Sequence, residues 1–279
     1  MDSELPPPDP ESAPKRTRRL LIVAYNGAPW SGFQQQANAP SIAGALDEAI
    51  AHIDPQASRV LGSSRTDAGV HARFQPVTFD TTRTIASRGW LLGLTSHLPR
   101  TIAVLRTAEA PLDFDPRTRP LWKEYRYTLL RSIVEDPFLT DSAWRIGHAL
   151  DLELMRAEAR ALVGEHDFAA FRSSADPRTA TVRHLARVSI EESKADPRLI
   201  EIVVRGNRFL YNMVRIIAGT LVDVGRGHLA PGAVLRALES KDRRQLGMTA
   251  PARGLCLCHV ELPNWGANPW PEAPISTPG

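Results

Sequence analysis

The chain has 279 residues, of which 43% are hydrophobic and 23% are charged. This composition is typical of a soluble globular protein that buries its core without disulfide bonds, and the length suggests two domains or one large one. A net charge of +3 gives a mild preference for an anionic partner, and all but four of the 34 basic residues are arginines, which suit phosphate contacts. An arginine-rich proteome would give the same bias, so both explanations stay open.

Several protein classes are disfavoured at this stage. No apolar run approaches the ~18 residues that a membrane helix needs, and residues 1–14 are acidic and proline-rich without the apolar core of a signal peptide. We therefore expect a cytoplasmic protein in which residues 1–17 form a disordered tail. Cys256 and Cys258 share one face of a predicted strand, which is a poor arrangement for zinc or a disulfide. No metal or cofactor is predicted.

The first half of the chain alternates strand and helix patterns. Ser41 is a good N-cap for a helix whose apolar residues recur at i, i+3 and i+4, and Asp54-Pro55 ends that helix. The predicted elements are strand Leu20–Tyr25, helix Ile42–Ile53, strands Arg59–Gly62 and Phe74–Phe79, helix Ser87–His97 and strand Thr101–Arg106.

Residues 111–120 hold three prolines and are predicted to link a domain at residues 18–110 to a second one at residues 121–263. Asp151 caps a helix that Gly164 closes, and Pro231 is expected at the first position of a short helix. The predicted elements of this half are strand Trp122–Leu130, helix Leu152–Val163, strands Arg187–Glu192 and Leu199–Arg205, helix Phe209–Val224 ended by Gly225, a helix to Ser240 and strand Leu255–Leu262. Residues 264–279 are expected to be a loose tail. The pattern predicts an α+β protein of two similar domains with mostly antiparallel strands and a cleft between them.

The most informative stretch is the octapeptide Arg-Thr-Asp-Ala-Gly-Val-His-Ala, residues 65–72, which lies between two strand-forming segments. It is predicted to be a loop on a rigid scaffold, where catalytic residues often lie. Asp67 is its only acid, and Gly69 allows positive φ if the turn requires it. Asp-x-Gly is also ordinary turn chemistry, so this feature alone favours no function.

Three other stretches accompany the octapeptide. They are Lys-Glu-Tyr-Arg-Tyr at residues 123–127, Gly-Asn-Arg-Phe-Leu-Tyr-Asn-Met-Val-Arg at residues 206–215, and Gly254-Leu255 after an Ala-Pro pair. Together with the octapeptide they resemble the motifs of the TruA family of tRNA pseudouridine synthases, from about Leu20 to Pro263. The chain departs from that family's pattern at Asn26, at Phe33 and at Asp115-Pro116.

The resemblance implies the pseudouridine synthase fold, a mixed and mostly antiparallel sheet with flanking helices around a basic cleft. It also implies an isomerase that converts uridine to pseudouridine in the anticodon stem-loop of tRNA, acting as a homodimer without a cofactor. The family's catalytic aspartate falls on Asp67 and its arginine partner on Arg215. Tyr125 takes the role of the tyrosine that contacts the target base, Leu255 that of a leucine lining the pocket, and Arg65 that of the arginine that fills the gap left by a flipped base. The Tyr125 phenol can stack on uracil, or its oxygen can help to move the C5 proton.

The chemistry of this reaction sets a requirement on Asp67. The C1′–N1 bond breaks and a C5–C1′ bond forms, with no group lost and no electrons exchanged, so no metal or cofactor is needed in principle. A carboxylate must attack C1′ or remove a sugar proton, and the sequence leaves this choice open. Because burial would raise the pKa of that carboxyl, a cation such as Arg215 is expected beside it.

Each assignment has a structural alternative. Arg215 would be a helix-surface arginine, Tyr125 and Leu255 ordinary core, and Arg65 a phosphate contact. His71 has no predicted catalytic role, and backbone hydrogen bonds are expected to satisfy it.

Two other functions are considered. One is a non-catalytic RNA-binding protein or RNA folding helper on the same scaffold. The other is a hydrolase that uses Asp67 and His71 around a metal, although two ligands on one loop make a poor metal site.

Overall fold

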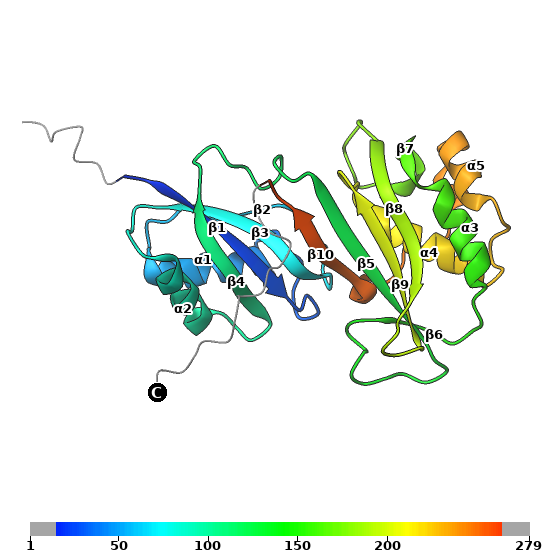
Figure 1. The fold of residues 1–279 in the computed structure, drawn as a ribbon, viewed down its shortest axis with the longest axis horizontal. Coiled ribbons are helices and arrows are strands. Elements are labelled where there is room, and N and C mark those ends of the chain that lie inside the picture. Colours follow the sequence, from blue (N-terminus) through cyan, green and yellow to red (C-terminus); the bar gives the residue numbers. More distant parts are fainter. Residues whose placement is uncertain (1–14, 264–279) are drawn as a thin grey trace, which may run out of the picture.

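The computed structural model describes residues 15–263, so the predicted tails at residues 1–14 and 264–279 lie outside the described residues. Within this range the chain forms five α-helices and one ten-stranded sheet that runs through both halves (Figure 1). None of the helices in the described residues is long and apolar enough to span a membrane. The α+β prediction is confirmed. The division into two domains at residues 111–120 stays a prediction, and strands from both sides of that segment belong to one sheet.

The sheet has the strand order β4-β1-β3-β10-β5-β9-β8-β7, with β2 paired to β3 and β6 paired to β5. All pairs are antiparallel except β10 with β3 and β5 with β6, which confirms a mixed, mostly antiparallel sheet. The strands are β1 (Thr17–Tyr25), β2 (Leu61–Gly62), β3 (His71–Thr81), β4 (Ile102–Ala110), β5 (Trp122–Arg131), β6 (Trp144–Ile146), β7 (Gly164–Asp167), β8 (Val182–Glu192), β9 (Leu199–Gly206) and β10 (Leu255–Glu261).

The last strand joins the two halves of the molecule. β10 lies between β3 of the first half and β5 of the second, at the centre of the sheet (Figure 1). In this arrangement the loop before β3, the strand β5 and the segment before β10 come together in space, although they are far apart in sequence.

The helices divide between the halves. α1 (Ile42–Ile53) and α2 (Ser87–His97) accompany the first half of the sheet, whereas α3 (Leu152–Ala161), α4 (Met213–Gly225) and α5 (Ala233–Ser240) accompany the second (Figure 1). The predicted bounds of α1 and α2 are confirmed. The predicted caps also form, since Ser41 Oγ accepts a hydrogen bond from Gly44 N at 3.1 Å and Asp151 Oδ1 accepts one from Leu154 N at 3.0 Å.

Three predicted helix bounds in the second half are wrong. α3 ends at Ala161, and Gly164, with φ +113°, opens a strand instead of closing the helix. α4 begins at Met213 because Asn212 has φ 61°, which a continuing right-handed helix excludes. Gly232, with φ 82°, is the N-cap of α5, so Pro231 lies before the helix.

The strand predictions differ from the structure mainly at their ends. β1, β4 and β8 extend over polar residues that pair with neighbouring strands, which the apolar pattern did not show. The short strands β6 and β7 were not predicted, because three or four residues give too little alternation to recognise.

Helix α4 carries Arg215, the residue that the sequence predicts beside Asp67. The predicted apolar stripe is buried, but the burial extends all round the helix: within Met213–Gly225 every residue except Arg215 is buried. A charged side chain on such a helix is costly unless it has partners, so Arg215 is expected to be held by acceptors.

Candidate active site

Residues 65–70 of the octapeptide lie in the connection between β2 and β3, as the sequence predicts, whereas His71 and Ala72 already belong to β3, which begins three residues before its predicted start at Phe74. Backbone hydrogen bonds fix this connection to the loop after β1: Phe33 N donates to Thr66 O at 3.0 Å, and Gly69 N donates to Trp30 O at 3.2 Å. A further bond from Val70 N to Asp67 O closes the turn at 3.1 Å. The loop that carries Asp67 is therefore held in place by a second segment of backbone.

Two glycines allow this close approach. A Cβ atom on Gly27 would lie 2.0 Å from Val70 O, and one on Gly32, where φ is +95°, would lie 2.8 Å from Thr66 O. Both neighbours are backbone atoms of the octapeptide, so neither collision is relieved by turning a side chain.

Gly27→Ala is expected to displace the octapeptide and lower the rate of the reaction at Asp67 by at least about tenfold, since small misplacements of reacting groups cost that much or more. The measurement is the single-turnover rate, with Gly147→Ala as the matched control. A Cβ on Gly147 would lie 3.1 Å from the end of the flexible Arg145 side chain and 3.9 Å from Ser132 O, an ordinary contact distance. Equal rates for the two variants would contradict the role given to the close contact.

Asp67 and Arg215 form an ion pair although 148 residues separate them in sequence. Arg215 Nη1 donates to Asp67 Oδ2 at 3.0 Å, and each side chain is 19% exposed. The guanidinium also donates from Nε to Ala250 O at 2.8 Å and from Nη1 to Asn212 Oδ1 at 3.0 Å. Three acceptors thus fix the arginine, and the carboxylate faces it from the octapeptide.

The electrostatics at Asp67 follow from two opposing effects. Burial raises the pKa of the Asp67 carboxyl, and the hydrogen bond and positive charge of Arg215 oppose this rise. The carboxyl remains accessible enough to react, and the arginine favours its ionised form.

Tyr125, on β5, lies near the pair. It is buried, and its ring meets that of Phe209 edge-on with the ring centroids 5.0 Å apart. Burial raises the pKa of the phenol to about 12, a hydrogen bond with Ser64 opposes this rise, and the negative charge of Asp67 adds to it. The phenol is therefore neutral near physiological pH. Tyr127, two residues on, donates to Pro251 O at 2.7 Å and is enclosed in the core.

The remaining two predicted site residues differ in exposure. Leu255 is buried and faces Tyr127 in the β10–β5 ladder, so it belongs to the core at the edge of the site. Arg65 is exposed, two residues from Asp67, and forms no hydrogen bond or ion pair within residues 15–263. It is the member of the group that is free to meet another molecule.

Sequence reasoning did not single out several residues that support the loop. Lys123 Nζ donates to Ser63 O at 2.7 Å and to Ser64 Oγ at 2.9 Å, and burial together with the charge of Arg208 lowers the pKa of Lys123 to about 8. Tyr25 and Thr66 share a hydrogen bond of 2.7 Å between their hydroxyl groups. The sequence offered one signal for Lys123, because it lies in the same five-residue motif as Tyr125.

His71 is satisfied by backbone hydrogen bonds, as predicted. Its Nδ1 accepts from Gly27 N at 3.1 Å, and its Nε2 contacts Asp141 O at 2.7 Å and Arg253 O at 3.0 Å. Since both ring nitrogens are engaged, a metal at Asp67 and His71 has no free imidazole nitrogen to bind, which argues against the hydrolase hypothesis.

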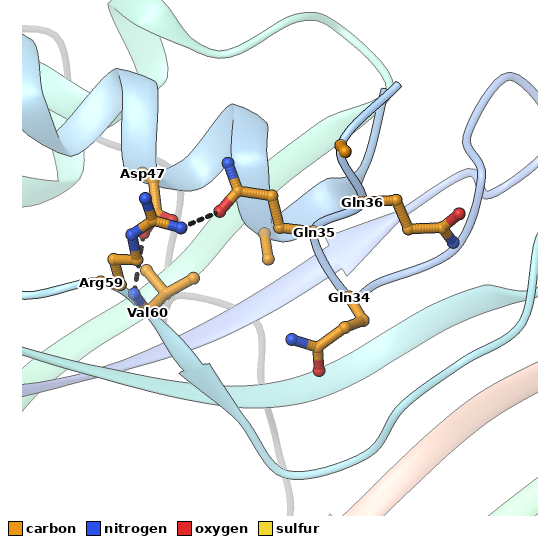
Figure 2. Close-up of a pocket in the computed structure, with 8 residues that line it drawn as sticks. Gln34, Gln35, Gln36, Asp47, Arg59 and Val60 are labelled. Carbon is orange, nitrogen blue, oxygen red and sulfur yellow. Dashed lines mark hydrogen bonds between the residues drawn. The ribbon is translucent and has the colours of Figure 1, made fainter. Parts of the chain in front are cut away.

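A separate hollow of about 400 Å³ lies beside α1 and contains none of the predicted site residues (Figure 2). Gln35 Oε1 accepts from Arg59 Nη1 at 2.6 Å across it, and Asp47 Oδ1 accepts from Val60 N at 2.8 Å. The lining residues are Gln34, Gln35, Gln36, Ala37, Ala43, Asp47, Arg59 and Val60.

Comparison with known proteins assigns the chain to a family. A family model described as tRNA pseudouridine synthase matches residues 159–263. A tRNA pseudouridine synthase A of Geobacter sp. (strain M21) is 42% identical over 87% of this chain and 98% of its own length. The proteins of the same name from Geotalea uraniireducens (strain Rf4) and Listeria monocytogenes serotype 4a (strain HCC23) are 43% and 37% identical, over 86% and 88% of this chain and 97% and 99% of theirs.

Among solved structures, a chain of an archaeal box H/ACA sRNP complex aligns with 75% of this chain and 43% of its own length, at 12% identity and a TM-score of 0.36. That likeness is too weak to support any argument about the site. The sequence relatives decide the matter, because their identity extends over nearly their whole length and most of this chain. The chain belongs to the tRNA pseudouridine synthase A family.

Proposed function

We propose that Asp67 is the catalytic carboxylate with which this tRNA pseudouridine synthase isomerises uridine in the anticodon stem-loop of tRNA. The observation that carries the proposal is the Asp67–Arg215 ion pair, which joins the octapeptide to the only position of α4 that is not buried. The charge of Arg215 meets the one acid of the octapeptide, and Ala250 and Asn212 hold the guanidinium in that position.

The chemistry then proceeds without an external reagent. In one route Asp67 attacks C1′ as the C1′–N1 bond breaks, the freed uracil turns, and the bond from Asp67 to C1′ breaks when C5 bonds to C1′. In the other route Asp67 removes a sugar proton as the C1′–N1 bond breaks, and it returns that proton to the sugar after C5 has bonded to C1′. The C5 proton leaves and N1 gains a proton, so the product is an isomer of the substrate. Arg215 keeps Asp67 ionised and oriented in both routes.

Tyr125 supports the uracil in this scheme. With its pKa raised to about 12, the Tyr125 phenol is almost fully protonated at neutral pH and little phenolate is present to remove a proton, so its ring and its neutral hydroxyl are the groups that contact the base. Leu255 borders the same region from β10. A uridine in a stacked stem must first be flipped out, at a cost of a few kcal/mol. The exposed Arg65 is placed to enter the space that it leaves.

The assembly and location belong to the same proposal. A homodimer is proposed, with a second copy covering the loop between β5 and β6, where Ile133, Val134 and Phe138 are 85%, 70% and 94% exposed. A molar mass of a single chain in light scattering would contradict the dimer. A tRNA substrate places the enzyme in the cytoplasm.

The direct test is to map pseudouridine in unmodified tRNA after treatment with the purified protein. New pseudouridines are expected on the 3′ side of the anticodon stem-loop, without added metal or cofactor. Pseudouridine at other positions only would contradict the proposed target. Bound but unmodified tRNA would favour the RNA-binding alternative.

A further inference from the structure

His71 connects the octapeptide to three separate backbone segments. It is the first residue of β3, four residues after Asp67, and pairs with Cys256 of β10. Its partners are Gly27 in the turn after β1, Asp141 in the loop before β6 and Arg253 in the short turn before β10. No two of these partners belong to the same element, so one side chain holds together segments that the sheet alone does not fix.

The partners define the protonation state of the ring. Gly27 N–H is a donor, so Nδ1 must present its lone pair, while Asp141 and Arg253 offer carbonyl oxygens, so Nε2 must carry the proton. The hydrogen bonds thus assign a neutral imidazole with the proton on Nε2. Neither nitrogen is left to act on a substrate.

Two of these segments, those of Gly27 and Arg253, reach the Asp67–Arg215 pair or the loop that carries it. Gly27 packs against Val70, where there is no room even for a Cβ. The turn that ends at Gly254 begins at Ala250, whose carbonyl accepts the hydrogen bond from Arg215 Nε at 2.8 Å. Its Ala252 methyl lies 3.4 Å from the position of a Cβ on Gly69. Fixing Arg253 therefore fixes the backbone that holds Arg215.

We propose that His71 is a positioning residue, which sets the octapeptide and the Ala250–Gly254 turn in the register that the Asp67–Arg215 pair needs. The inference rests on the proposed function of that pair and adds to it a residue with no substrate contact. If His71 served stability alone, its loss would weaken the fold without a specific effect on the reaction step.

Three variants separate the hydrogen bond at Nδ1 of His71 from those at Nε2. His71→Gln places an amide donor near the Nε2 position and gives up the acceptor for Gly27, His71→Asn keeps an acceptor near the Nδ1 position and gives up the donor, and His71→Phe removes both. We expect His71→Phe to lower the single-turnover rate by about 10- to 100-fold, since the buried Gly27 N–H loses its acceptor and the carbonyls of Asp141 and Arg253 lose their donor. His71→Gln and His71→Asn should each recover part of that loss. The dissociation constant for tRNA should change by less than about twofold, because His71 contacts only protein.

A double-mutant cycle provides the decisive readout. If His71 acts by positioning the Asp67–Arg215 pair, His71→Phe should lower the rate little further in an Arg215→Ala background. The ion pair that His71 positions is already absent in that background. The same fold loss in both backgrounds would overturn the inference, as would a rate unchanged in His71→Phe. His166→Phe is the matched control. His166 lies on β7, the edge strand of the sheet, and its Nε2 bonds to Val163 O at 3.1 Å. Loss of this imidazole should leave the rate unchanged.

Failure of His71→Phe to fold and failure of the proposed function can each be told apart from failure of the inference about His71. If His71→Phe does not fold, as judged by its urea unfolding curve, the Gln and Asn variants carry the cycle in its place. If Asp67→Asn keeps its activity, the proposed function fails whatever His71 does. An inactive Asp67→Asn with a fully active His71→Phe would leave the proposed function standing and remove only the inference about His71.

Discussion

Asp67→Asn is expected to lower the rate of pseudouridine formation by about four orders of magnitude or more, the scale on which loss of an enzymatic nucleophile usually acts. The amide has nearly the size of the carboxylate but no negative charge, so it neither attacks C1′ nor removes a sugar proton. Arg215 keeps its bonds to Ala250 and Asn212 in this variant, so the pocket should stay formed. tRNA binding should stay within about threefold of wild type, because the substitution removes no positive charge.

The measurement pairs single-turnover pseudouridine formation with a tRNA binding titration. Asp47→Asn is the matched control, because burial also raises the pKa of Asp47 and its Oδ1 accepts from Val60 N, which an amide oxygen does equally well. The control should keep full activity. Should Asp67→Asn still form pseudouridine at a comparable rate, the catalytic assignment would fail and the RNA-binding alternative would gain support.

The elements that the sequence predicts well are those whose ends have a local chemical cause. Ser41 and Asp151 cap helices with their own side chains, so the starts of α1 and α3 are readable from single residues. The start of α4 was missed because the apolar pattern continues from Phe209 through Asn212, whose positive φ excludes it from the helix. The Asn212 side chain accepts a hydrogen bond from Arg215 instead.

The residues of the candidate site also divide into those that the sequence singles out and those that it does not. The resemblance of the octapeptide to a family motif singles out Asp67 as a candidate without any structure, and the same resemblance singles out Arg215 as its expected partner. Arg215 looks like a surface residue in the sequence pattern, and its place as the exception on a buried helix becomes visible only when α4 packs on the sheet. The tie from His71 to Arg253 spans 182 residues, so no local pattern predicts it.

Arg215→Ala is expected to reduce the rate at neutral pH by about 10- to 100-fold, the range for loss of a hydrogen bond between charged groups. The effect on tRNA binding should be much smaller, because the guanidinium is turned inward to Asp67, Ala250 and Asn212. Arg215→Lys should recover only part of the rate, since one ammonium group cannot reach all three acceptors in the same geometry. An equal loss in rate and in binding would indicate a phosphate contact instead.

The pH dependence gives this variant its sharpest test. Asp67 must be ionised to react, so the wild-type rate falls as the pH drops through the pKa of Asp67, which burial has raised. Arg215 opposes that rise, and its removal therefore raises the pKa of Asp67 further. The acid limb of the rate profile should move to higher pH in Arg215→Ala. Arg226→Ala, which removes a different arginine–carboxylate pair, with Asp223 at the end of α4, should leave the limb in place.

Stability should follow the same linkage. A carboxyl whose pKa is higher in the folded protein than in the unfolded chain binds more protons when folded, so it favours folding at low pH, and this contribution is lost as the pH rises through the folded-state pKa. Without Arg215 the folded-state pKa of Asp67 lies higher still, so the free energy of unfolding of Arg215→Ala should fall more steeply than that of wild type between acid and neutral pH. Urea unfolding at a series of pH values measures this slope. Parallel curves for the two proteins would mean that Arg215 does not control the ionisation of Asp67.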